Sequence, residues 1–372
     1  IPFTYHFDAA LPQSTVSCVG ETFQHNSWLH RSCKFENMCL DLETNKFVLV
    51  QSAASKKVQT AINEKGAAAS QYTVSNSMSR NTSSVSIGGY LHNWGWGQTK
   101  RSESNTALEW FPEILEENEL SSSGYYELLG DKVLFPFHAI APMNIGHLML
   151  DSFLPIYTVL STFGMSYKKL VLMRYQTEGK PLWATCDDDN PDFAPKCERN
   201  FRKFLPLMGS SMEEFSTVSN YTLRMTPELT TPTSKYLCFP HAAAGIGLLT
   251  DHGLKKGHGN LVTDYISGDT NNALHNVGRG PLIWRFRQYM LHNMGMLQQS
   301  RRTSNKKMRR NKTLQITFST HSSTGANRDL AFEAQVKALE TLLGSTASNR
   351  TVSDVSVRAV KMSDLTIKEQ IQ

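Results

Sequence analysis

The sequence has no long apolar run, no zinc-type cysteine pairs and no evident internal repeat. No stretch reaches the roughly 18 apolar residues that a helix needs to cross a bilayer. None of the six cysteines is separated from another by two residues, the spacing typical of zinc knuckles. The chain begins at Ile1 and not at Met, which leaves room for a signal peptide or membrane anchor upstream of residue 1.

The chain also lacks a strong net charge. Its 38 Lys and Arg residues against 33 Asp and Glu residues give a formal net charge of +5, and much of the excess lies in one basic run at 301–312. No aromatic residue interleaves this run, so nucleic-acid bases would find no stacking platform there. We therefore expect a solvated basic linker and no nucleic-acid partner.

The cysteines are the first positive feature. An even number fits disulfides in an oxidising compartment. Cys33 and Cys39 lie close together, and Cys186 and Cys197 bracket an acidic loop, so we expect two local disulfide loops, with two pairs of buried thiols as the alternative. The chain also contains four Asn-x-Ser/Thr sequons, which permit a secretory location: Asn81, Asn220, Asn311 and Asn349.

Apolar periodicity predicts an α/β protein. A strand at 132–137, a helix at 144–163 with one apolar stripe and a strand at 169–173 form a β-α-β unit, which favours a parallel sheet. Further strands are predicted at 46–50 and at 236–239, the second followed by a turn of small residues at 241–247. The remaining predictions are helices at 199–207 and 282–296 and long loops at 51–105, 178–198 and 250–281.

The C-terminal part predicts a second, incomplete domain. Strands at 314–319 and 355–360 alternate with helices at 329–343 and 366–372, as at the start of a Rossmann-like domain. Such a domain needs about five or six parallel strands, so we expect this chain to stop before the domain is complete. The predicted organisation is an N-terminal domain at 1–297, a basic linker at 298–312 and the first part of a second domain at 313–372.

One helix combines three polar residues. Asn144, His147 and Asp151 are spaced so that they share one side of an otherwise apolar helix. A His beside a carboxylate can act as a general base, or the carboxylate can orient the imidazole. An equally balanced alternative is a helix N-cap at Asn144 with a surface pair of His147 and Asp151.

The segment at 137–157 resembles the Asn-x-x-His hallmark of glycosyltransferase family 61. That family includes the EGF-domain O-GlcNAc transferase, the protein O-mannose GlcNAc transferase and plant xylosyltransferases. Weaker similarities follow the family's order along most of the chain: the cysteine motif at 31–41, the strand and turn at 236–247, the Phe-Arg helix at 286–291, the strand at 316–319 and the segment at 355–370.

The resemblance implies a GT-B-like fold, in which two Rossmann-like domains face a cleft. It implies inverting transfer of a sugar, GlcNAc or a pentose, from a UDP-sugar donor to a hydroxyl group of a glycoprotein or polysaccharide acceptor. It also implies a protein of the Golgi or ER lumen that requires no divalent metal ion. His147 and Asp151 would be the catalytic residues, with the choice of base open between them, and Asn144 and Arg328 would contact substrate.

Departures from the family's pattern support an alternative. Thr320 and His321 stand where the family usually has an Arg, and Phe332 precedes Glu333 where the family tends to have Asn-Glu. The family's His-Gly-Ala-Gly-Leu motif would follow the last residue, so we expect these 372 residues alone to be inactive. The alternative is a catalytically silent, secreted carbohydrate-binding relative. A metal-dependent transferase built on the Asp-x-Asp at 187–189 is a third interpretation, but a solvated acidic loop explains that run better.

Overall fold

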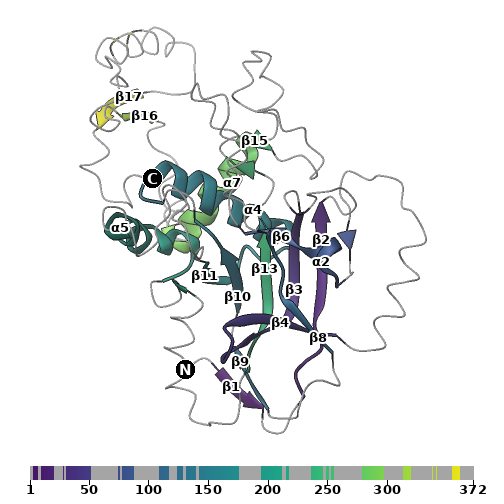
Figure 1. The fold of residues 1–372 in the computed structure, drawn as a ribbon. Helices are drawn as coiled ribbons and strands as arrows, with labels where there is room; N and C mark the ends of the chain where they lie inside the picture. The colour runs from purple at the N-terminus through teal and green to yellow at the C-terminus, as the bar shows by residue number, and fades with distance from the viewer. Residues whose placement is uncertain are drawn as a thin grey trace, which may run out of the picture. The chain divides into compact units, whose positions relative to one another are not determined.

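The structure is a computed structural model, and the chain in it forms two compact units, 1–290 and 291–372. The described residues are 3–6, 10–20, 28, 31–51, 74–75, 78–87, 109–116, 124–128, 131–139, 142–175, 194–211, 215–217, 236–245, 249–250, 253–254, 279–296, 313–319, 337, 341 and 354–360. Figure 1 shows the first unit built on a large sheet with helices α4, α5 and α7 beside its parallel strands.

One half of this sheet is parallel and confirms the α/β prediction. The strands β10 (Lys132–Phe137), β11 (Lys169–Arg174), β12 (Phe215–Thr217) and β13 (Tyr236–Gly245) lie in the order β12-β11-β10-β13. Each neighbouring pair among them is parallel. If these four strands are numbered along the chain, their order in the sheet is 3-2-1-4, which is the order with which a doubly wound sheet begins.

The other half is mostly antiparallel, with two short parallel pairings, which makes the sheet mixed. Its central strand is β3 (Arg31–Asp41), which pairs with β13 on one side and with β2 (Thr15–Gly20) on the other. The remaining strands of the eleven are β1 (Phe3–His6), β4 (Lys46–Gln51), β5 (Val74–Ser75), β8 (Glu113–Glu116) and β9 (Tyr125–Leu128). Short pairs outside the sheet are β6 (Val85–Ser86) with β7 (Glu109–Trp110) and β14 (Leu249–Thr250) with β15 (Gly253–Leu254).

Strand β13 is longer than predicted, and the expected turn at 241–247 is wrong. The strand continues through Gly245, which pairs with Ser32 of β3. The run of small residues serves close packing between strands. A Cβ atom on Gly245 would lie only 2.6 Å from the Ser32 hydroxyl oxygen and 2.7 Å from its Cα.

Strand β3 changes the face that it presents at its middle. Phe35 and Met38 belong to the same buried cluster, which strict alternation of side chains would not allow. Between them Asn37 has a φ of 55°, a left-handed conformation that shifts the alternation by one residue. Cys39 therefore lies in a second, smaller cluster, while Cys33 lies with Phe35.

The disulfides correct the predicted local loop between Cys33 and Cys39. Cys33 pairs with Cys18, its neighbour on β2, and Cys39 pairs with Cys238, its neighbour on β13. The second bridge spans 199 residues of sequence, so spacing along the chain could not indicate it. Cys197 is also disulfide-bonded, and Cys186 lies outside the described residues.

The predicted helix after β10 is present, but its central part is not α-helical. It consists of α3 (Ile145–His147), a π-helical segment (Leu148–Phe153) and α4 (Leu154–Thr162) in direct succession. The single apolar stripe was wrong, because all side chains from Leu154 to Leu160 are buried while Ile145 is 47% exposed. A helix that is buried on every side belongs to the core and not to the surface.

Two further helices pack around α4 and β10. The helix α5 (Ala194–Phe204) begins before the predicted end of the acidic loop, and a 3-10 turn (Leu205–Met208) follows it up to Gly209, which has a φ of 69°. The helix α7 (Arg279–Asn293) covers most of the helix predicted at 282–296, but it is not strongly amphipathic, because Ile283 and Trp284 are exposed. Its Phe286 ring lies 5.4 Å from the Tyr157 ring of α4. On the other side Phe137 of β10 contacts Phe201 of α5, with ring centroids 6.3 Å apart.

The second unit contains the two predicted strands. The strands β16 (Thr313–Ser319) and β17 (Asp354–Val360) pair in parallel over their whole length. Of the predicted helix at 329–343 the structure describes Lys337 and Thr341, both helical, with the Thr341 hydroxyl donating to the Lys337 carbonyl at 2.8 Å. The predicted linker and the helix at 366–372 lie outside the described residues, so the proposed domain boundaries stay a prediction.

Candidate active site at the carboxyl ends of the parallel strands

The topology of the sheet marks one place where a ligand is expected. From β10 the chain continues to β11 on one side, whereas β13 joins β10 on the other side, so the strand order reverses between β10 and β13. In open α/β sheets, ligands bind outside the carboxyl ends of the strands at this reversal. Strand β10 ends at Phe137, and the Asn-x-x-His segment begins at Asn144, after a connection at 138–143.

Asn144 starts the helix as its N-cap. Its side-chain oxygen accepts a hydrogen bond from the Gly146 N–H at 2.9 Å, and the residue is exposed. The cap satisfies a backbone donor that the first turn of a helix leaves without an internal partner. The interpretation of Asn144 as a helix N-cap is therefore confirmed, because its side-chain oxygen accepts the capping hydrogen bond.

Asn200 of α5 holds the loop that leads into this helix. Its side-chain nitrogen donates to the carbonyl oxygens of Pro142 and Met143, at 2.9 and 3.0 Å, and the residue is buried. Asn200 was not among the residues predicted from the sequence. Its helical spacing from apolar residues could have indicated it, because Asn200 shares the buried side of α5 with Cys197, Phe201 and Phe204. A polar residue on a buried helix face needs a partner.

The π-helical segment coincides with the candidate catalytic residues. It begins immediately after His147 and contains Asp151. Such segments are rare, and they are frequently found at functional sites. The described side chains of this part fix the helix in place, since Leu148 and Phe153 are fully buried. The side chains of His147 and Asp151 lie outside the description, as does the whole of Arg328, so the grouping of the three stays a prediction.

Two polar residues follow the neighbouring strands and were not predicted, of which His138 is buried and Tyr175 is half-buried. His138 comes after β10, and its Nδ1 lies 3.0 Å from the carbonyl oxygen of Tyr175, which comes after β11. The Tyr175 hydroxyl accepts a hydrogen bond from the Trp110 indole at 2.8 Å, and burial raises the pKa of Tyr175 well above its usual value. The Tyr175 hydroxyl is therefore neutral, and its hydrogen bond positions Trp110 at this end of the sheet.

No metal centre is evident in the described part of the chain. Among those residues, no group of three or more His, Cys, Asp or Glu side chains could hold a metal ion. The acidic run at 187–189 lies outside them. None of the described helices is long and apolar enough to cross a membrane.

Comparisons with known proteins give no identification. No protein-family model matches the chain, and no curated protein sequence matches it. The resemblance to glycosyltransferase family 61 therefore stays a prediction. The disulfides do indicate the broad compartment, because such bonds form and persist in secreted and lumenal proteins.

Proposed function

We propose that this protein is an inverting glycosyltransferase of the family 61 type, active in the Golgi or ER lumen. The observation that carries the proposal is the position of the Asn-x-x-His segment. It follows the carboxyl end of β10, beside the reversal of strand order, and leads into a π-helical segment that contains Asp151. The disulfide bonds support a lumenal location.

The proposed reaction uses one side chain of this helix as a base. His147 or Asp151 takes the proton from an acceptor hydroxyl group while the hydroxyl oxygen attacks the anomeric carbon of a UDP-sugar. The bond between that carbon and the diphosphate oxygen breaks, its electron pair leaves with UDP, and the new glycosidic bond has inverted configuration. Arg328 would balance the charge of the departing diphosphate, because a guanidinium group matches phosphate geometry.

The second unit is proposed as the start of a donor-binding lobe. Its parallel strands β16 and β17 have the connectivity with which a Rossmann-like domain opens. Together with the parallel half of the first unit, this supports the proposal of a GT-B-like enzyme. Transfer of GlcNAc or a pentose to a glycoprotein or polysaccharide is the activity that we propose on this basis.

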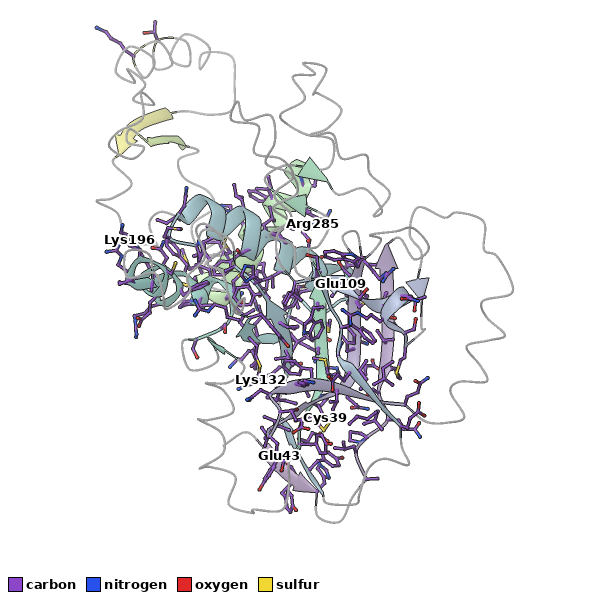
Figure 2. All side chains as sticks on the ribbon, in the orientation of Figure 1. Cys39, Glu43, Glu109, Lys132, Lys196 and Arg285 are labelled. Carbon is purple, nitrogen blue, oxygen red and sulfur yellow. A yellow bond between two sulfur atoms is a disulfide. The ribbon has the colours of Figure 1, made fainter. Side chains whose placement is uncertain are left out.

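The test is a transfer assay on protein made from the complete reading frame. UDP release would be measured with UDP-GlcNAc and with UDP-pentoses, in the presence of glycoprotein or polysaccharide acceptors and with or without excess chelator. We expect UDP release with one of these donors, at a rate that excess chelator does not lower. The catalytic rate should fall by about 10²–10⁴-fold in His147→Ala or Asp151→Asn. Lys196→Ala is the matched control, since Lys196 is exposed on the neighbouring helix α5 (Figure 2).

The departures at Thr320 and Phe332 favour a second candidate, a secreted carbohydrate-binding protein without activity. Glycan binding without UDP-sugar binding or hydrolysis would support this candidate and contradict the enzyme. Loss of activity in chelator would instead point to a metal-dependent transferase. Full activity in both helix variants would remove the catalytic role of His147 and Asp151.

A further inference from the structure

One sequon lies in the described part of the chain, on a short helix beside a disulfide. Asn81, Thr82 and Ser83 belong to α2 (Arg80–Ser83), which is capped by the Ser79 side chain. The other three sequons lie outside the described residues. Asn81 is exposed, whereas Ser83, the third residue of the sequon, is fully buried.

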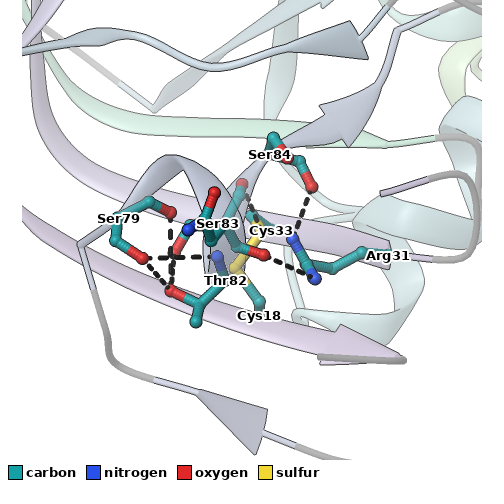
Figure 3. Close-up of a disulfide and its surroundings, with 8 residues drawn as sticks. Cys18, Arg31, Cys33, Ser79, Thr82, Ser83 and Ser84 are labelled. Carbon is teal, nitrogen blue, oxygen red and sulfur yellow. Dashed lines mark hydrogen bonds between the residues drawn. A yellow bond between two sulfur atoms is a disulfide. The ribbon is translucent and has the colours of Figure 1, made fainter. Parts of the chain in front are cut away.

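The segment at 78–87, called the strap from here on, contacts residues of β3 through its backbone carbonyl groups. Arg31 donates to the carbonyl oxygens of Ser84 and Asn81, at 2.9 and 3.3 Å (Figure 3). The Ser83 carbonyl oxygen lies 3.3 Å from the sulfur of Cys33, which is bonded to Cys18. The backbone of Asn81 is thus anchored through its carbonyl group while its side chain is exposed, so a bulky group on the side-chain amide would not disturb the anchor.

We propose that Asn81 carries an N-linked glycan, added before the strap folds. The disulfides indicate a secreted or lumenal protein, the class in which Asn-x-Ser/Thr sequons are modified. The Asn81 amide nitrogen forms a bond to the anomeric carbon of a lipid-diphosphate-linked oligosaccharide. The bond from that carbon to the diphosphate oxygen breaks, and the lipid diphosphate leaves while the amide gives up one proton.

The order of synthesis leaves time for this step. The strap is closed by residues that are made later than the sequon: Val85 pairs with Trp110, and the Ile87 carbonyl oxygen accepts from the His138 N–H at 2.6 Å. At about 5–20 residues per second, roughly 30 residues between Asn81 and Trp110 correspond to a few seconds. During this interval the contacts with Trp110 and His138 cannot form, and the sequon can enter a transferase as an extended segment.

The direct test needs no variant. The full chain, carrying a signal peptide, would be secreted from a eukaryotic cell and treated with an amidase that removes N-linked glycans in heavy-oxygen water. We expect the peptide containing residue 81 to appear as aspartate labelled with heavy oxygen. Recovery of this peptide from the secreted protein only with an unmodified asparagine would overturn the proposal.

Two variants give an independent measurement by gel mobility. The Asn81→Gln chain should migrate faster than the unchanged chain by the equivalent of one glycan. The Thr82→Ala chain should migrate like the unchanged chain, because the middle residue of a sequon does not determine its modification. Identical mobility of the Asn81→Gln and unchanged chains would count against the glycan.

Discussion

Arg31 is the most deeply buried charged residue that the structure describes, and it organises the strap. Its side chain is fully buried and bonds to two carbonyl groups of that segment. Burial lowers the pKa of Arg31 to about 10, partly offset by Glu109, so the group is charged at neutral pH. A buried charge that donates to backbone carbonyl groups acts as a fixed donor, a role that a shorter or uncharged side chain cannot fill.

We predict that Arg31→Met lowers the free energy of unfolding by roughly 1–3 kcal/mol, because the Ser84 carbonyl loses its donor inside the protein. Urea unfolding would measure the change. Arg202→Met is the matched control, since Arg202 and its partner Glu198 are both exposed on α5, and its cost should stay within about 0.5 kcal/mol. Equal effects of the two changes would contradict the anchoring role of Arg31.

Gly245 is required where β13 approaches β3. It has a φ of 132°, and an added Cβ atom would lie within 2.8 Å of three atoms of Ser32. We predict that Gly245→Ala costs more than about 2 kcal/mol, from strain together with a backbone clash. Gly164→Ala should cost only about 1 kcal/mol, because Gly164 has a φ of 67° but open space around it. Thermal or urea unfolding of the two variants would give the comparison.

Among the elements, β3 joins the two halves of the large sheet. It lies between β13 and β2, and a disulfide links it to each of them. The change of face at Asn37 places one disulfide in each of two buried clusters, with Cys33 in the larger and Cys39 in the smaller. The Cys39–Cys238 bond thus joins β3 to the parallel half covalently, in addition to the hydrogen bonds between β3 and β13.

The two disulfides should contribute unequally to stability. Replacing Cys39 and Cys238 by alanine opens a loop of 199 residues, whereas replacing Cys18 and Cys33 opens one of 15 residues. The chain-entropy model gives about 5 kcal/mol for the first change and about 3 kcal/mol for the second. Urea unfolding of the two double variants would measure the order, and a greater loss on removing the Cys18–Cys33 bridge would contradict it.

Several elements could be predicted because their signals are local. The strands β4, β10, β11, β16 and β17 are short apolar runs, and each was predicted to within about one residue. The extension of β13 was missed, because small residues favour a turn when read alone and a close strand pair when a neighbour such as Ser32 is present. The π-helical segment also gave no local signal, since the spacing of its apolar residues fits an ordinary helix.

At the scale of the whole molecule, we expect stability to depend on pH through His241 of β13. Burial lowers the pKa of His241, with Lys168 and Lys34 acting in the same direction and Glu36 and Asp131 against it. The unfolded chain therefore binds this proton first, near pH 6.5. The contribution of His241 to stability is complete above that pH and is lost as the pH falls through the folded-state pKa.

The measurement is urea unfolding between about pH 7.5 and pH 5. The free energy of unfolding should decrease as the pH falls, and His241→Gln should show a shallower decrease. Equal slopes for the two proteins would contradict the assignment to His241. Because Glu36, whose pKa is lowered by hydrogen bonds from Lys34 and Thr15, loses its contribution only at lower pH, the two groups are separable.

The sequence by itself determined the class of the fold, the positions of the helix and strands around the Asn-x-x-His segment, and the presence of enough cysteine for disulfides. These properties depend on the periodicity and composition of short stretches. Only the tertiary structure decided which cysteines pair, where β3 changes face, and that the strand order reverses beside the segment that follows β10. The physical reason is that register and strand order are contacts between residues far apart along the chain, and no local pattern specifies which distant strand will be the neighbour.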